Sequence, residues 1–196
     1  MSSVANISPP TGQRYPSGDL AMWMFILAEL LVFALLFGAY GFTRLQHLEL
    51  FNQLQQQLNR ELALVNTIAL ITASYTVVRS VLAVKAGRSQ QAARWMWMSF
   101  ALGMVFVVVK SYEYSAYFGQ GISLSTNVFY MFYLGLTFFH YMHVLLGLVI
   151  LAAMAIKICR GGYEGGDHSG LESGAAYWHM VDLVWLILFP LIYVMH

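Results

Sequence analysis

The chain has 196 residues, of which 59% are hydrophobic and only 10% are charged. A soluble domain carries about 25% charged residues, so this composition indicates an integral membrane protein. The formal net charge of +1 argues against a nucleic-acid partner, which would require a strongly basic face. Cys159 is the single cysteine of the sequence, which excludes an intramolecular disulfide and any metal site built from several cysteines.

Residues 1–19 are polar and lack the run of about 7–15 apolar residues that a signal peptide requires. We expect them to form a cytoplasmic N-terminal segment. Residues 20–196 are expected to form one transmembrane domain, because five apolar stretches reach the length of about 20 residues that a membrane span needs. The predicted fold class is therefore all-α, an integral membrane bundle of five transmembrane helices. The predicted spans are 20–42, 62–84, 94–118, 128–156 and 175–195.

The connecting segments favour one orientation in the membrane. Thr43–Glu61 is rich in glutamine, with leucines at helical spacing, and predicts an amphipathic extension of the first or second span. Lys157–Gly174 is rich in glycine and predicts a flexible turn. The positive-inside rule places the N-terminus in the cytoplasm and the C-terminus in the periplasm, because only Arg44 and Arg60 lie on the other side. The basic residues on the N-terminal side are Arg14, Arg79, Lys85, Arg88, Arg94, Lys157 and Arg160.

Polar residues inside the spans are the candidate functional residues, because ionisable groups within a membrane usually face a bundle interior or a cavity. Three pairs are three residues apart and so share one face of a helix. These pairs are Lys110 with Glu113, His140 with His143, and His179 with Asp182, and Glu29 and Asn66 stand apart from them.

Three interpretations of these residues stay open. The first is hydrogen bonding between helices, in which Lys110 neutralises Glu113, and His179 donates to Asp182 or to a neighbouring helix. Hydroxyls of Tyr130, Tyr133 and Tyr141 could then bond His140 or His143 on adjacent turns.

The second interpretation is proton handling by Glu29 or Glu113, since burial in lipid favours the neutral form of a carboxyl. The third is a metal or haem site in which His140, His143 and His179 supply nitrogens and Asp182 orients one of them. The sequence contains neither a Glu-x-x-His bundle motif nor HExxH. We therefore expect no catalytic residue and no metal ligand in this chain. The lack of internal repeats disfavours a transporter.

The fifth span resembles the closing helix of subunit III of the haem-copper oxidases, where a Trp-His-x-x-Asp-x-x-Trp pattern recurs. The other four spans resemble the same family in the same order. Lys110 departs from the family, which usually has glutamine there. The matching residues are Trp23, Phe25 and Glu29 in the first span, Asn66, Thr67, Leu70 and Ser74 in the second, Glu113 and Tyr114 in the third, His140, His143, Val144 and Gly147 in the fourth, and Glu172, Trp178, His179, Asp182 and Trp185 in the fifth.

The resemblance implies a helical bundle in two groups around a lipid-filled cleft, in the short bacterial form that lacks the first two of seven helices. It implies a bacterial inner-membrane subunit without haem or copper of its own. Such a subunit packs against the catalytic subunit, which carries the haem and metal, supports proton uptake and binds phospholipid. By the same resemblance, Glu113 corresponds to the family's carbodiimide-reactive glutamate, and His179 and Asp182 fix the bundle.

Three kinds of complex contain this short form: cytochrome c oxidases, quinol oxidases and bacterial nitric oxide reductase with its accessory protein. The small size, the opening "PSGDLAMWMFILAE" and Lys110 are most similar to the nitric oxide reductase accessory group. Subunit III proper of an aerobic oxidase is the alternative. A free-standing membrane haem or metal protein is an alternative of another class. The expected partners are a catalytic subunit and membrane lipids.

Overall fold

The computed structural model describes residues 20–163 and 168–195, and within these ranges all regular secondary structure is helical. Five of the helices are long and apolar enough to cross a membrane, so the predicted all-α bundle is confirmed and the chain is a multi-pass membrane protein. The predicted segment 1–19 lies outside the described residues. The helices are α1 Leu20–Gln46, α2 Leu48–Gln55, α3 Arg60–Lys85, α4 Ser89–Gly119, α5 Val128–Cys159, α6 Ser169–Phe189 and a terminal π-helical turn, η1, Pro190–Val194.

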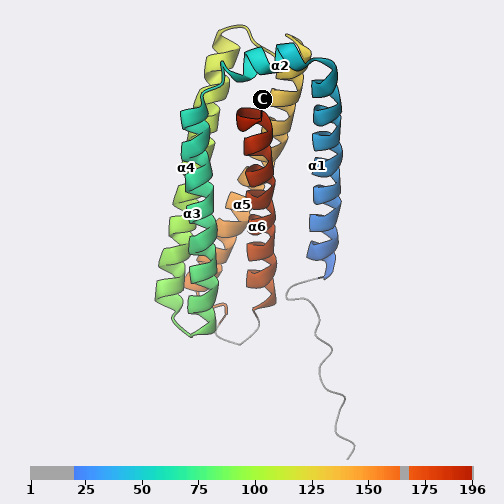
Figure 1. Ribbon diagram of the computed structural model, residues 1–196. Helices are drawn as coiled ribbons and strands as arrows, with labels where there is room; N and C mark the ends of the chain where they lie inside the picture. The colour runs from blue at the N-terminus through green and yellow to red at the C-terminus, as the bar shows by residue number, and fades with distance from the viewer. Residues whose placement is uncertain (1–19, 164–167, 196) are drawn as a thin grey trace, which may run out of the picture.

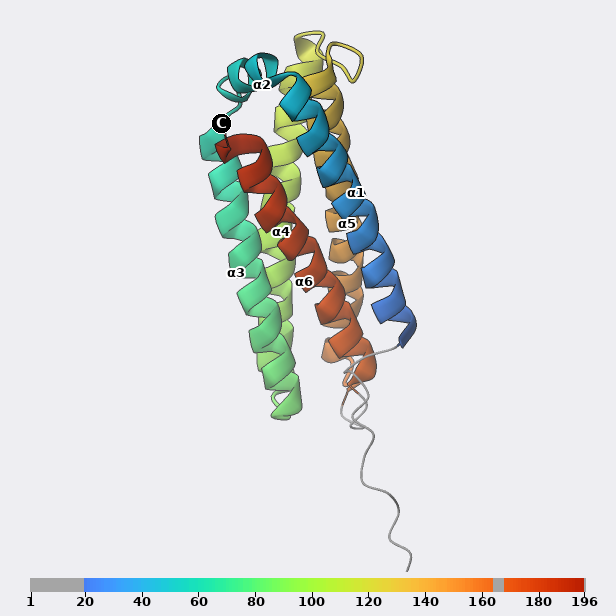
Figure 2. The same cartoon turned by 45° about the vertical axis from the view of Figure 1, so that its right-hand side comes forward.

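Helix α6 occupies the middle of the bundle (Figure 1). It packs against α3, α5 and α1, while α3 pairs closely with α4 and α4 with α5. Seen from the side, α6 runs obliquely between α3 and α1 (Figure 2). Only 11% of the apolar window of α1 is buried, compared with 50% for α3. The bundle therefore consists of a tightly packed group of four helices with α1 attached at its edge.

Small residues allow α6 to approach its neighbours. The buried ring of Trp178 lies between two glycines, Gly103 on α4 and Gly147 on α5. A Cβ atom added to Gly103 would lie 2.8 Å from this ring, and one added to Gly147 would also lie 2.8 Å from it. Close helix packing through small residues is typical of membrane bundles, because lipid provides no hydrophobic force that pulls helices together.

The connecting segments differ from the prediction. Thr43–Glu61 does not simply extend one span, because α1 ends at Gln46 and a separate short helix, α2, follows after His47. The predicted flexible turn over 157–174 is also too long, since α5 continues to Cys159 and α6 begins at Ser169. Helix α3 begins at an ordinary cap, where the Asn59 side chain accepts a hydrogen bond from the backbone of Leu62 at 3.1 Å.

Helix α2 closes the end of the bundle at which α6 ends (Figure 1). Pro190 interrupts α6 because a proline has no N–H for the helical hydrogen bond and its ring clashes with the preceding turn, and the chain continues as a π-helical turn. The last carbonyls of this turn have no later helical N–H to bond, so they need other donors. The Gln55 side chain donates to the Ile192 carbonyl at 2.9 Å, and Arg44 donates to the Met195 carbonyl at 2.9 Å.

Candidate functional site

Lys110 and Glu113, two of the candidate functional residues, form the centre of a buried polar cluster between α4, α5 and η1. Lys110 Nζ lies 2.8 Å from Glu113 Oε2 and 2.8 Å from the hydroxyl of Tyr193. Tyr133 donates a hydrogen bond to Glu113 Oε1, and the Tyr193 hydroxyl lies 3.3 Å from the same oxygen. We refer to Lys110, Glu113, Tyr133 and Tyr193 as the lysine–glutamate cluster.

The hydrogen bonds of this cluster fit an ionised pair. A carboxylate can only accept, and an ammonium can only donate. Both oxygens of Glu113 have donors directed at them, and Lys110 also lies 5.4 Å from the ring of Trp185, in cation–π range. The side chains of Lys110 and Glu113 are 0% and 4% exposed. The cluster is thus closed from its surroundings, and each charge is compensated within this chain.

The cluster lies toward the end of the bundle that holds α2. Glu113 is six residues before the end of α4 at Gly119, which corresponds to about 9 Å along the helix axis. Tyr133 lies in the second turn of α5, which starts from the same end at Val128. Lys110 and Glu113 are therefore far from the end of the bundle at which α1 begins.

Glu29 and His143 form a second polar site, the glutamate–histidine pair, between α1 and α5. His143 Nε2 lies 3.0 Å from Glu29 Oε2, and His143 Nδ1 lies 2.8 Å from the backbone carbonyl of Phe139. The Glu29 side chain is 21% exposed and that of His143 is 10% exposed. Unlike the lysine–glutamate cluster, this pair is at the loosely attached edge of the bundle.

The pair holds one shared proton. A carbonyl can only accept, so Nδ1 of His143 must carry the hydrogen that bonds to Phe139. The contact between Nε2 and Glu29 then needs one more proton, which resides either on the imidazole or on the carboxyl. Either distribution preserves the hydrogen bond, so the geometry of the pair is compatible with both.

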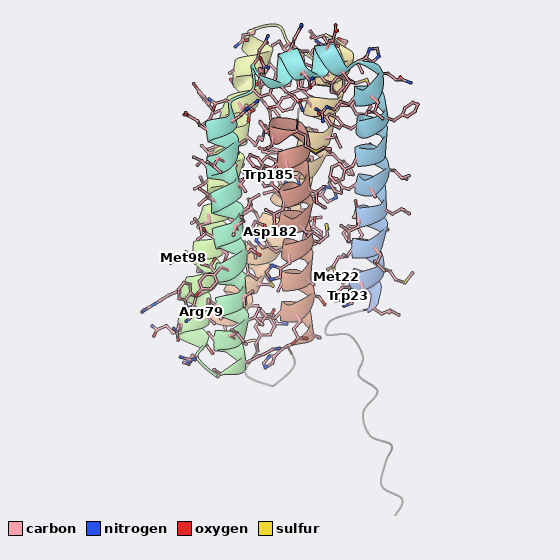
Figure 3. All side chains as sticks on the ribbon, viewed as in Figure 1. Met22, Trp23, Arg79, Met98, Asp182 and Trp185 are labelled. Carbon is pink, nitrogen blue, oxygen red and sulfur yellow. The ribbon has the colours of Figure 1, made fainter. Side chains whose placement is uncertain are left out.

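Of the two partners predicted for His179, Asp182 or a neighbouring helix, the structure shows the hydrogen bond to the neighbouring helix. His179 Nδ1 lies 3.9 Å from Asp182 Oδ2 but only 2.7 Å from the hydroxyl of Ser74 on α3. Both Asp182 oxygens are buried and lack a hydrogen-bond partner among the described residues. Figure 3 shows Asp182 and Trp185 on α6, where the Trp185 indole donates to the Thr67 hydroxyl at 2.9 Å. Bonds from Ser74 and Thr67 thus connect α3 to α6.

The structure separates the remaining candidates. His140 is fully buried and stacks on Trp185 with ring centroids 5.3 Å apart. The ring nitrogens of His140 and the amide of Asn66 have no hydrogen-bond partner within residues 20–163 and 168–195. Tyr133 and Tyr141 do not bond the histidines as predicted, because Tyr133 bonds Glu113 and Tyr141 bonds Ser111.

The three histidines considered as metal ligands do not share a polar contact. His143 contacts Glu29, His179 contacts Ser74, and His140 contacts aromatic rings. In the described part of the chain, no three histidine, cysteine or acidic side chains are grouped so that they could hold a metal ion. This arrangement does not provide the converging ligand set of the third interpretation.

A cavity of about 600 Å³ opens one helical turn from the glutamate–histidine pair. It lies between α1, α5 and α6, and its wall is mainly apolar: Ala21, Met22, Phe25, Leu146, Ile150, Ser169, Gly170, Ser173, Gly174 and Tyr177. Phe25 and Tyr177 stack with ring centroids 6.1 Å apart. The Tyr177 hydroxyl donates to the His143 carbonyl at 3.2 Å, which connects the cavity wall to the pair.

Sequence reasoning missed the tyrosines that complete the lysine–glutamate cluster. Tyr193 lies 83 positions from Lys110, and Tyr133 lies 20 positions from Glu113. Spacing along one helix carries no information about such contacts. The only available signal was the unusual presence of a lysine inside a span, which requires polar partners from other helices.

Comparison with known proteins agrees with this architecture. The family model described as cytochrome c oxidase subunit III matches residues 17–196. The chain is 32% identical over 177 residues to "Cytochrome c oxidase subunit 3" of Thermostichus vulcanus, covering 90% of this chain and 86% of that protein. It is 28% identical over 202 residues to "Probable quinol oxidase subunit 3" of Staphylococcus saprophyticus, covering 98% and 96%.

A third relative, "Cytochrome c oxidase subunit 3" of Corynebacterium diphtheriae, is 30% identical over 172 residues, covering 87% of this chain and 84% of that protein. The family match extends over all five spanning helices. These findings agree with the ordered motifs in the five spans, and the chain belongs to the cytochrome c oxidase subunit III family of the haem-copper oxidases.

Proposed function

We propose that this chain is a non-catalytic subunit that packs against and stabilises the catalytic subunit of a respiratory complex of the haem-copper oxidase superfamily. The match of residues 17–196 to the subunit III family carries this proposal. The geometry supports it, because the charged groups of the lysine–glutamate cluster are compensated within the chain. Haem and redox metal then belong to the partner subunits.

The finer proposal is that the partner is a nitric oxide reductase. Its support is the short form, the opening segment and Lys110, which replaces the glutamine usual in the family. Lys110 bonds the carboxylate of Glu113 and the hydroxyl of Tyr193. A lysine at this position therefore goes together with a particular set of partner side chains in the bundle. A cytochrome c or quinol oxidase is the second candidate, favoured by the similarity to subunits 3 of such oxidases.

The cavity between α1, α5 and α6 is the proposed binding site for a phospholipid chain. Its volume of about 600 Å³ and its mainly apolar wall fit acyl chains. Because α1 is only lightly packed, lipid in this space would fill the gap between α1 and the other helices. The site is separate from the lysine–glutamate cluster, which is at the other end of the bundle.

Proton exchange, if this subunit supports proton uptake, is proposed for the glutamate–histidine pair. The pair is partly exposed beside the lipid cavity and can hold its shared proton on either member. Glu113 and Lys110 are the less suitable candidates, because their charges are locked in a closed network. We further propose a bacterial inner-membrane location with the N-terminus in the cytoplasm, supported by the excess of basic residues at that end.

Purification of the tagged chain from its native membrane in a mild detergent tests the proposal. Accompanying proteins are identified by mass spectrometry. We expect a catalytic subunit of the superfamily in a fixed ratio to the tagged chain. A nitric oxide reductase subunit would support the finer proposal, and an oxidase subunit would replace it with the second candidate. Recovery of the chain without any such subunit would contradict the general proposal.

A further inference from the structure

A groove lies on the α3–α4 side of the bundle, away from the cavity between α1, α5 and α6. It has a volume of about 350 Å³ and is near the end of the bundle at which α3 ends and α4 begins. Figure 3 shows Arg79 on this side, toward that end of α3. The groove is lined by Tyr75, Val78, Arg79, Leu82, Ala83, Arg88, Gln91 and Trp95.

Arg79 is an exposed charge inside a membrane-spanning helix. It lies six residues before the end of α3 at Lys85, about 9 Å along the helix axis. A charged side chain at this depth is costly in hydrocarbon unless it finds a partner or reaches the polar headgroups. Arg79 therefore needs an anion or a polar layer within reach of its guanidinium.

Aromatic side chains hold this guanidinium in the groove. The guanidinium carbon of Arg79 lies 5.2 Å from the ring of Trp95 and 5.8 Å from the ring of Tyr75. The guanidinium also donates to the Tyr75 hydroxyl at 2.9 Å. These contacts fix the direction of the side chain but supply no negative charge. Within residues 20–163 and 168–195, no carboxylate pairs with Arg79 or Arg88.

The rest of the groove matches a lipid. Val78 and Leu82 are 42% and 57% exposed and lie on α3 one turn apart, which gives an acyl chain an apolar surface beside the charged end. Basic pockets between transmembrane helices are typical binding sites for anionic lipid headgroups. Arginine also suits phosphate, because its planar N–H groups can bond two phosphate oxygens at once.

We propose that the α3–α4 groove binds an anionic phospholipid, with its phosphate between Arg79 and Arg88 and one acyl chain along Val78 and Leu82. This site is independent of the proposed function, because it follows from the uncompensated arginines and not from the partner complex. It is also distinct from the lipid cavity, whose lining contains no basic side chain.

The test measures lipid binding to the purified full chain, with any subunits that accompany it, by native mass spectrometry. The probes are phosphatidylglycerol, zwitterionic phosphatidylcholine and inorganic phosphate. Arg79→Gln removes the central charge of the groove and Arg79→Lys keeps it. Arg160→Gln is the matched control, because Arg160 is an exposed basic residue at the same end of the bundle that does not line the groove.

We expect the wild type to prefer phosphatidylglycerol to phosphatidylcholine. Arg79→Gln should weaken phosphatidylglycerol binding about fivefold, as expected for one basic residue near an anionic headgroup. Arg160→Gln should change it less than twofold. Arg79→Lys should weaken it less than Arg79→Gln does, because lysine keeps the charge but lacks the paired N–H groups of arginine. Lipid bound in the cavity between α1, α5 and α6 should contribute equally to all variants, because none of the three substitutions lies in the lining of that cavity.

Three results would overturn the proposal. One is an equal effect of Arg79→Gln and Arg160→Gln, which would indicate a general effect of surface charge. Another is equal binding of the two lipids. The third is displacement of phosphatidylglycerol by inorganic phosphate at millimolar concentration, which would identify a free-phosphate site instead.

Discussion

The lysine–glutamate cluster and the glutamate–histidine pair each hold a carboxyl inside the membrane bundle, but the surroundings of the two carboxyls differ. Glu113 is 4% exposed and receives hydrogen bonds from three side chains. Glu29 is 21% exposed and has one hydrogen-bond partner, His143, in the part of the chain that the structure describes. The first carboxyl is held in a closed network with a buried lysine, whereas the second contacts one histidine at a partly exposed site.

This difference follows the packing of the bundle. The lysine–glutamate cluster lies among the four closely packed helices and the terminal turn, where any lost partner leaves a charge in a medium of low polarity. The glutamate–histidine pair lies between α1 and α5, at the edge of the bundle. Side chains such as Phe33 and Phe139, with ring centroids 5.0 Å apart, connect the two helices there. Structural rigidity is therefore expected from the first site, and exchange with the surroundings from the second.

Replacing one member of the closed cluster should have the largest effect. Lys110→Met leaves Glu113 without its countercharge, and breaking a buried pair in this way costs about 3–5 kcal/mol. We expect a large fall in the thermal unfolding midpoint of the detergent-solubilised protein. The double variant Lys110→Gln with Glu113→Gln should recover most of the loss, because two neutral amides can bond the tyrosine hydroxyls. A wild-type midpoint in Lys110→Met alone would show that the cluster is not structural.

A methyl group added between the closely packed helices α5 and α6 should have the next largest effect on stability. Gly147→Ala brings a Cβ to within 2.8 Å of the Trp178 ring, and overpacking of this kind costs about 1–3 kcal/mol. Gly38→Ala on α1 is the matched control, since no side chain lies within 4 Å of that position. The control should be neutral or slightly stabilising, because alanine favours the helix. Equal unfolding midpoints for the two variants would contradict the proposed difference in packing.

Removing the partly exposed carboxyl of Glu29 should have the smallest effect on stability. Glu29→Gln keeps a hydrogen-bonding group opposite His143 in a partly exposed site, so we expect a change of no more than about 1 kcal/mol. Equilibrium unfolding in denaturant would measure it. A loss as large as that of Lys110→Met would mean that both carboxyls serve the same structural role.

Chemical modification sharpens the comparison further. Carbodiimide reacts with accessible carboxyls that carry a proton, so we expect labelling at Glu29 and protection at Glu113. This expectation differs from the one based on family resemblance, which assigned the reactive carboxyl to Glu113. Peptide mapping of the labelled protein, with Glu29→Gln as control, would identify the site. Labelling of Glu113 in the folded protein would contradict the closed state of its cluster.

The sequence predicted those features that depend on neighbouring residues. Span length is a local property, so the five spanning helices could be read from apolar stretches of about 20 residues. The contact between Lys110 and Glu113 could be anticipated from their spacing of three. The Glu29–His143 contact joins residues 114 positions apart, and only tertiary packing determines it. A bond from His179 to a neighbouring helix was predicted, but its partner Ser74, 105 positions away, could not be named for the same reason.

Errors in the predicted connections have a different cause. The break at His47 and the short helix α2 depend on contacts with the end of α6, where Gln55 donates to the Ile192 carbonyl. The Ile192 carbonyl is free because the π-helical turn ends at Val194, which leaves its last carbonyls without helical donors. An amphipathic pattern over residues 43–61 could not distinguish an extension of a span from a helix that covers the end of the bundle.

The most direct test of an accessory role is to produce the chain without any partner subunit and to measure its optical spectrum and its haem and metal content. An accessory subunit should show no haem absorbance and much less than one metal ion per chain, while the complex from native membranes should show both. Haem or metal bound in stoichiometric amount to the isolated chain, and lost on substitution of His140 or His143, would contradict the proposed role and identify a redox centre in this subunit.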